Sequence, residues 1–359
     1  MGMTHRERLI NAMRGRETDR LPWSPFLAYY FEHLPQEIQD RGQVPYLLKM
    51  GADPLLRGFV QLFDTKIKNC TVTEKQSGFK KYTSYETKVG TLTKEFTFSP
   101  NANSWFLTGH PVTEEEDFKV LQYIAENTVV TERIREFEEE DKELGENGLH
   151  LPLLGIFGKT ALQSMVEQWC GTVDLVYALC DFPEAVEECL AAIQDKDQET
   201  VEISVKGSAE GFIFWEDSST TNISPEMFAK YTAPEVDRWG STIHSHDKLL
   251  VHHACGHLRD LLPLMAKTQI DMIESISPPP TGNIDLPEAI TMLPDHIGLI
   301  GGIEPTFFAR CTEEELEHRV RELTAAMEGK RFILANSDSC PPEVAYEKFG
   351  QVSAMISGK

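Results

Sequence analysis

The feature that most constrains the fold is a regular alternation of short apolar runs and helix-like segments in the second part of the chain. From residue 149 onward, six apolar runs of strand length occur, and each precedes a segment whose apolar residues recur with helical spacing. The runs are 151–157, 211–215, 249–253, 270–276, 297–303 and 331–335. Strands that alternate with helices predict βα units and a parallel sheet.

Two further apolar stretches, at 25–30 and 55–60, bring the expected number of strands to eight. Eight such units form a (β/α)8 TIM-type barrel of about 250 residues. The chain has 359 residues, and we assign the surplus to an N-terminal helix within 1–20 and a β-hairpin insertion at about 75–100. We therefore expect a single barrel domain over 1–359. An open doubly wound sheet is the weaker alternative, because no GxGxxG turn follows any of the strands.

Charge and hydropathy limit the classes of partner. The chain carries 34 Lys and Arg against 57 Asp and Glu, a formal net charge of −23. Recognition of nucleic acid or of an anionic membrane needs clustered cations, so we expect neither partner. No run of 18 apolar residues occurs, and the charged start MGMTHRERLINAMRG has no apolar signal core, which predicts a cytoplasmic protein. The sequence leaves open whether the chain forms a homodimer.

Acidic and aromatic side chains stand where the expected strands end, which is where a parallel barrel carries its active site. Glu216 and Asp217 follow the apolar run GFIFW, and two adjacent acids in that place are candidate catalytic residues. Helix capping by Asp217 is the alternative interpretation. The candidate substrate-binding residues are Tyr29, Tyr30, Trp215 and Glu274.

A histidine and two cysteines form the candidate metal site. His253 and Cys255, in LLVHHACGH, are two residues apart, so their side chains share one face of a strand. Cys340, in NSDSCPP, follows the last apolar run and lies at the same end of the barrel. One imidazole and two thiolates with an open position are a catalytic zinc donor set. Packing of these residues in the core is the alternative interpretation.

Several segments together resemble the uroporphyrinogen decarboxylase superfamily, and within it the corrinoid-dependent methyltransferase branch. They are THRERLINAMRGRETDRLP at the start, GFIFWEDSS with ISPEMF, the H-x-C-G at His253 to Gly256, GGIEP at Gly301 to Pro305, and SDSCPPEV near the end. The resemblance implies a (β/α)8 barrel and a zinc ion held by His253, Cys255 and Cys340. The arginine motif with which the decarboxylase holds its porphyrinogen is absent from residues 23–30, which argues against that reaction.

The activity that the resemblance implies is methyl transfer between a small substrate and the cobalt of a corrinoid. A partner protein would carry the corrinoid, because the chain has no D-x-H-x-x-G signature. Glu216 or Asp217 would orient the substrate or the zinc-bound group, and the aromatic residues would suit an aromatic methyl ether. The hairpin region and the segment around Trp105 resemble the demethylating members more than the thiol-methylating ones, which favours O-demethylation. Three alternatives remain: a methylcobamide:thiol methyltransferase, a metal-free decarboxylase or lyase, and a subunit that docks a corrinoid protein without turnover.

Overall fold

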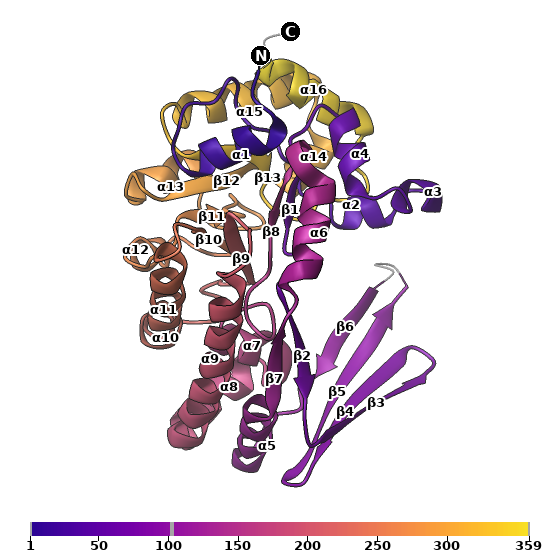
Figure 1. The fold of residues 1–359 in the computed structure, drawn as a ribbon, viewed down its shortest axis with the longest axis vertical. Coiled ribbons are helices and arrows are strands. Elements are labelled where there is room, and N and C mark those ends of the chain that lie inside the picture. The colour runs from indigo at the N-terminus through magenta and orange to yellow at the C-terminus, as the bar shows by residue number, and fades with distance from the viewer. Residues whose placement is uncertain (1, 101–103, 358–359) are drawn as a thin grey trace. The chain divides into compact units, whose positions relative to one another are not determined.

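The structure is a computed structural model that describes residues 2–100 and 104–357. The chain forms two compact units, coloured by residue number in Figure 1. The barrel unit comprises Met1–Gln61, Arg135–Leu153 and Gly207–Lys359, and the second unit comprises Leu62–Ile134 and Leu154–Lys206. The segments inserted between the barrel strands form the second unit, and the single domain over 1–359 stays a prediction.

The barrel unit contains the parallel strands that the apolar runs predict. One five-stranded parallel sheet has, in spatial order, β9 (Gly211–Glu216), β10 (Leu249–Ala254), β11 (Met272–Glu274), β12 (Gly298–Ile303) and β13 (Phe332–Asn336). A second parallel pair has β1 (Leu55–Arg57) beside β8 (Leu149–Leu151). Isolated parallel bridges join Leu153 to Ile213 and Trp23 to Leu334, and the amide of Asp53 donates to the carbonyl of Trp23. These links close a (β/α)8 barrel.

The first barrel position differs from the expected strand at 25–30. The chain makes only the bridge at Trp23 there, and the short helix α2 (Tyr29–Glu32) follows. Pro22 and Pro25 have no N–H group to donate, so this segment cannot form a full hydrogen-bonded ladder. Two backbone hydrogen bonds join it to β13. The amide of Ser24 donates to the carbonyl of Leu334, and the amide of Leu334 donates to the carbonyl of Pro22.

The helix α1 (His5–Met13) closes the amino-terminal end of the barrel. Its buried residues Leu9, Ala12 and Met13 belong to the same apolar cluster as Leu55 and Leu149, the first residues of β1 and β8. The other members of this cluster are alternate strand residues: Leu151, Ile213, Leu249, Val251, Met272, Ile300, Ile333 and Ala335. Because α1 covers this end, a site in the barrel can open only at the carboxyl end of the strands.

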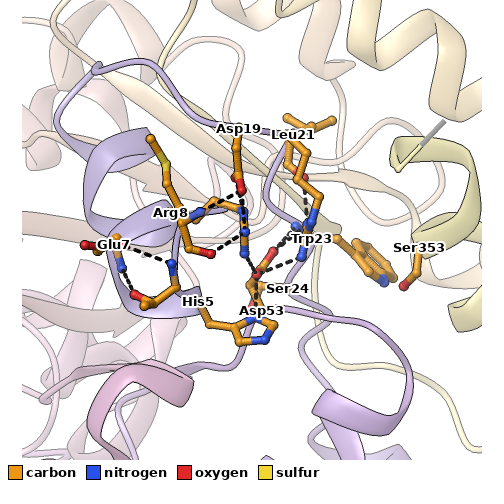
Figure 2. Close-up of polar contacts among 12 residues, drawn as sticks. His5, Glu7, Arg8, Asp19, Leu21, Trp23, Ser24, Asp53 and Ser353 are labelled. Carbon is orange, nitrogen blue, oxygen red and sulfur yellow. Dashed lines mark hydrogen bonds and ion pairs between the residues drawn. The ribbon is translucent and has the colours of Figure 1, made fainter. Parts of the chain in front are cut away.

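A buried carboxylate fixes the N-terminal segment to the barrel, as Figure 2 shows. Asp53, which is fully buried, accepts hydrogen bonds from Arg8, Arg20 and the amide of Trp23, and its Oδ1 lies 2.7 Å from Nδ1 of His5. Burial alone would raise the pKa of Asp53, but His5 and the two guanidinium groups outweigh it and lower that pKa. The N-terminal motif THRERLINAMRGRETDRLP therefore has a structural role.

Helices cover the outside of the barrel unit (Figure 1). Besides α1 and α2 they are α3 (Gln36–Gln39), α4 (Gln43–Lys49), α6 (Ile134–Leu144), α10 (Pro225–Met227), α11 (Ala233–His244), α12 (Leu262–Met265), α13 (Leu286–Met292), α14 (Pro305–Arg310), α15 (Glu313–Ala326) and α16 (Tyr346–Ile356). Across residues 2–100 and 104–357, no helix is both long enough and apolar enough to cross a membrane.

The second unit contains the expected hairpin within a larger antiparallel sheet. That sheet has β3 (Cys70–Ser77), β4 (Lys80–Thr87), β5 (Gly90–Ser99) and β6 (Ser104–Gly109), and the predicted turn near Gly90 joins β4 to β5. A separate antiparallel pair is β2 (Phe63–Ile67) with β7 (Thr128–Glu132). The helices of this unit are α5 (Glu115–Glu126), α7 (Ala161–Ser164), α8 (Thr172–Asp181) and α9 (Pro183–Ser204).

Candidate metal centre

Three potential ligands meet at the carboxyl end of the barrel strands. A nitrogen of His253, the sulfur of Cys255 and a carboxylate oxygen of Asp338 all lie within 4.8 Å of one another. His253 comes from the end of β10 and faces the barrel interior, because it lies two residues beyond the core residue Val251. Cys255 continues the same face, and Asp338 follows β13 by two residues. His253 is buried and the other two are partly exposed.

Glu274, the last residue of β11, and Ser275, which follows it, hold the imidazole of His253. Its Nδ1 lies 3.0 Å from Oε2 of Glu274 and 3.2 Å from Oγ of Ser275. A carboxylate at Nδ1 accepts a hydrogen bond from that nitrogen and leaves Nε2 with a lone pair for a metal ion. Burial opposes a charge on His253, but the hydrogen bond and charge of Glu274 outweigh this effect and raise the pKa of the imidazole.

Glu274 is itself paired with a buried arginine. Oε1 of Glu274 lies 3.0 Å from Nε of Arg57, the last residue of β1, and both side chains are almost completely excluded from solvent. Burial would raise the pKa of Glu274, but the charge of Arg57 and the bond to His253 lower it, so the carboxylate is ionised. Glu274 was predicted to bind substrate; the structure places it against a potential metal ligand, and its role toward a substrate stays a prediction.

The thiol of Cys255 lies beside the second predicted acid. Its Sγ is 3.7 Å from Oδ1 of Asp217 and 3.6 Å from the carbonyl oxygen of Glu216. The other carboxylate oxygen of Asp217 accepts a hydrogen bond from Asn222 at 3.1 Å. Asp217 is exposed and next to a thiol that must lose its proton to bind a metal ion, so its position agrees with a role in the site.

The third member of this group is Asp338, whereas Cys340 was the predicted ligand from the same loop. Cys340 is completely buried, its amide donates to the carbonyl of Phe26, and its carbonyl accepts from the amide of Tyr30. Its Sγ contacts the carbonyl oxygen of Pro341 at 3.8 Å. Burial raises the pKa of this thiol well above its usual range. The group formed by the described residues does not include Cys340, and its role as a metal ligand stays a prediction.

The carboxylate of Glu216 also differs from its expected place. It accepts a hydrogen bond from Ser218 at 2.6 Å and lies 3.1 Å from Nε2 of His252, and both residues are completely buried. Glu216 is one residue beyond the interior-facing Trp215, so it points to the outer face of the strand. The predicted catalytic role for its side chain is therefore not supported by its position, although its carbonyl oxygen accepts from the amide of Cys255.

The two tyrosines predicted to bind substrate lie away from the ligand group. Tyr29 is 52% exposed, and its carbonyl contacts the ring of His33. Tyr30 is buried in the packing of α2, where its ring centroid is 5.1 Å from that of Phe349 and its hydroxyl is 3.4 Å from that of Tyr46. These contacts are those of a core residue.

A different set of aromatic residues surrounds the imidazole. The ring centroids of Phe26 and Trp215 lie 6.1 and 6.4 Å from that of His253, and Phe59 lies 6.1 Å from Trp215. Trp215 was predicted as a substrate-binding residue, while Phe26 and Phe59 were missed. The signal for Phe59 was its place just beyond Arg57 at the end of β1. Phe59 is half exposed, so these rings form an apolar wall beside the potential ligands.

The residues of the group fit a metal ion. Zinc is bound by thiolate, imidazole and carboxylate atoms at about 2.0–2.3 Å, so ligand atoms of one ion are close neighbours, as these three are. Three protein ligands leave a fourth position open, which is the pattern of a catalytic site. The hydrogen bond that Nδ1 of His253 donates to Glu274 is a further feature of metal-binding histidines.

A solved structure of low sequence identity shares the fold of this chain. A methyltransferase from Methanosarcina mazei superimposes with a TM-score of 0.62 at 12% identity, over 99% of this chain and 99% of that one. A B12-independent methionine synthase from a Shewanella species aligns with a TM-score of 0.48 at 11% identity, over 94% of this chain and 96% of that one. No curated protein sequence matches the chain.

A family model described as uroporphyrinogen decarboxylase (URO-D) matches residues 107–357. The match covers more than half of the chain and includes β8 to β13, with His253, Cys255 and Asp338. It agrees with the barrel fold that the strands form and with the resemblance of the sequence motifs. The chain belongs to the uroporphyrinogen decarboxylase family.

Proposed function

We propose that this protein is a zinc-dependent methyltransferase that moves a methyl group between a small substrate and the cobalt of a corrinoid carried by a partner protein. The observation that carries the proposal is the group of His253, Cys255 and Asp338 at the open end of the barrel. An imidazole, a thiolate and a carboxylate with one position free are ligands for a catalytic metal ion. The barrel shared with a methyltransferase gives the reaction a suitable scaffold.

His253, Cys255 and Asp338 would hold the zinc ion. When bound, zinc supplies a Lewis acid for the heteroatom that bears the methyl group. Asp338 offers oxygen where the resemblance predicted a second thiolate, so the ligand set is harder and donates less charge to the metal. This difference favours a methyl donor with an oxygen or nitrogen leaving atom, and therefore demethylation.

The chain's own residues prepare the site. Glu274 holds the ring of His253 in one orientation through Nδ1, and Asp217 lies where it accepts the proton that the thiol of Cys255 loses. Trp215 and Phe26 place apolar surface beside the imidazole. That surface would exclude water from the methyl carbon and contact the body of an aromatic methyl ether.

In the overall reaction, the bond between the methyl carbon and the substrate heteroatom breaks and a carbon–cobalt bond forms. The heteroatom leaves with the bonding electron pair and is protonated, while Co(I) of the corrinoid supplies the pair for the new bond. The absence of D-x-H-x-x-G from the sequence supports a separate corrinoid protein.

Metal analysis and a methyl-transfer assay test the proposal together. Purified wild-type protein and the variant His253→Ala would be assayed for zinc, and then mixed with cob(I)alamin and 2-methoxyphenol while methylcobalamin is followed by absorbance. We expect about one zinc per chain, methylcobalamin formation by the wild type, and loss of both in His253→Ala. Methyl transfer from methylcobalamin to a thiol instead would assign the reaction to the thiol-methylating type. Wild-type protein without zinc would overturn the proposal in favour of a metal-free decarboxylase or lyase.

A further inference from the structure

Arg57 is a charged residue in an unusual position. It ends β1, its side chain is 0% exposed, and it faces the barrel interior two residues beyond the core residue Leu55. Completely buried arginines are rare and need a partner for their charge. The partner here is Glu274, the residue that contacts Nδ1 of His253.

The contacts of Arg57 fix the guanidinium group on one side. Its Nη2 donates to the carbonyl oxygen of Ser24 at 2.5 Å and to Oγ of the same residue at 3.0 Å. The hydroxyl of Ser24 also accepts from the amide of Leu55, and the guanidinium carbon lies 5.5 Å from the ring centroid of Phe26. Arg57 is therefore anchored to the backbone of the barrel, so it presents Nε to Glu274 from a fixed point.

We propose that Arg57 is a positioning residue for the metal centre. Anchored by Ser24, it holds the carboxylate of Glu274 in the site, and Glu274 in turn holds the imidazole of His253 with Nε2 directed to the ion. The inference rests on the proposed metal centre and assigns the support of its imidazole ligand to a residue on another strand.

Charge balance supports this role. The thiolate of Cys255 and the carboxylate of Asp338 would balance the two charges of a divalent ion. Glu274 would then be an excess negative charge at a buried position, and such a charge is unstable without a counter-ion. Arg57 is that counter-ion, with its Nε 3.0 Å from the carboxylate. Without Arg57, Glu274 would leave its place beside the imidazole.

A second observation agrees with a role for the charge of the guanidinium group. Its Nη1 is buried and has no hydrogen-bond partner among the described residues, and the Nε–Oε1 contact is an ion pair without hydrogen-bond alignment. An arginine kept only for hydrogen bonding would have these groups satisfied. The contact with Glu274 is thus mainly electrostatic. We therefore expect the variant Arg57→Lys to keep part of the metal affinity.

The test measures metal affinity in a double-mutant cycle. Wild type, Arg57→Met, Arg57→Lys, Glu274→Gln and Arg57→Met/Glu274→Gln would be titrated with Co²⁺ and with Zn²⁺ against a chelator, at equal folded concentration. We expect Arg57→Met and Glu274→Gln each to weaken binding by about 10–100-fold. The double variant should bind metal no more weakly than the weaker-binding single variant, because both substitutions act through the same contact. Arg57→Lys should regain part of the affinity.

A matched control separates positioning from general stability. Arg8 is also a buried arginine paired with carboxylates in the barrel unit, at the opposite end of the strands. Arg8→Met should lower the urea midpoint and leave metal affinity unchanged. If Arg57→Met does not fold, the metal affinity of the double variant, which removes both charges, is compared with that of Glu274→Gln.

Each failure has a distinct signature. Wild-type protein that binds neither metal would overturn the proposed metal centre and this inference with it. A wild type that binds metal, with Arg57→Met binding equally well, would overturn the inference alone. Additive losses in the double variant would also overturn it, because Arg57 would then act independently of Glu274. An unchanged Co²⁺ visible spectrum in Arg57→Met, despite weaker binding, would contradict a change in imidazole orientation.

Discussion

The imidazole of His252 lies 3.1 Å from the carboxylate of Glu216, on the face of β10 opposite to that of His253. The ring of His252 also stacks on Phe214, with centroids 4.3 Å apart. The apparent HH pair therefore has two separate functions. One histidine packs between the strand and its covering helices, and the other faces the potential metal ion.

This arrangement predicts that Glu216 contributes to stability more than to metal binding. Glu216→Gln should lower the free energy of unfolding by about 1–3 kcal/mol, because buried hydrogen bonds from Ser218 and His252 are weakened. Zinc content should be unchanged. Urea unfolding and metal analysis would measure both quantities. The neighbouring variant Asp217→Asn is the comparison, and it should change activity with little loss of stability; the reverse pattern would contradict this assignment.

The identity of the third ligand gives a second prediction. Asp338→Asn should reduce zinc affinity, because an amide is a weaker ligand than a carboxylate. Cys340→Ala should retain zinc and lose about 1 kcal/mol of stability through the small cavity left by the buried thiol. Equilibrium dialysis of both variants would decide between the two residues. Zinc loss in Cys340→Ala alone would restore the ligand set that the family resemblance implied.

Gly58 gives a third prediction, which concerns the aromatic wall. Gly58 has φ +72°, and a Cβ there would lie 2.5 Å from the indole of Trp215. Gly58→Ala should strain the backbone by about 1–2 kcal/mol and also displace the indole. We expect a higher KM for the methyl donor, measured in the methylcobalamin assay.

A matched glycine isolates the effect on the indole. Gly42 has φ +79°, and a Cβ there meets nothing within 4 Å. Gly42→Ala should therefore show the backbone strain with an unchanged KM. An equal rise in KM for both variants would mean that the contact with Trp215 is irrelevant to substrate binding.

The N-terminal network gives a fourth prediction, on pH dependence. The hydrogen bond from Arg8, at 2.7 Å, is the main cause that lowers the pKa of Asp19 from 3.8 to about 2. The unfolded chain then binds more protons than the folded chain between these values, so this contribution is complete above pH 3.8 and is lost as the pH falls through 2. In the variant Asp19→Asn, the free energy of unfolding should depend less on pH in this acidic range. Urea unfolding at a series of acidic pH values would measure it, and identical curves would contradict the prediction.

Most of the barrel could be predicted because its strands are buried on both faces. Runs such as 249–253 and 297–303 are rich in apolar residues and glycine, apart from the two histidines, and β10 and β12 occupy them to within one residue at each end. The stretch at 25–30 is equally apolar but flanked by prolines, and it forms a bridge and a short helix. Apolar content indicates burial there, while the missing N–H groups decide the backbone pairing.

The candidate site was only partly predictable, because sequence spacing does not fix the direction of side chains in loops. His253 and Cys255 lie on one strand face, so their spacing sufficed. Asp338 and Cys340 lie in a loop, where the backbone contacts of Cys340 with Phe26 and Tyr30 decide which side chain faces the imidazole. Arg57 was missed because an arginine after two leucines resembles a strand end at the surface. Arg57 lies two residues after Leu55, which faces the barrel interior, and this spacing was the available signal.

The ring of barrel strands closes between residues that are far apart in the sequence. The amide of Phe26 donates to the side chain of Asn336, 310 positions away, and Asp338 follows Asn336 by two residues. A ribosome delivers the N-terminal partner first, at about 5–20 residues per second. Phe26 must therefore wait many seconds for its partner, and a nascent chain has no complete ligand set until β13 has emerged. In the proposed metal centre, the ion would therefore bind only after residue 338 has left the ribosome.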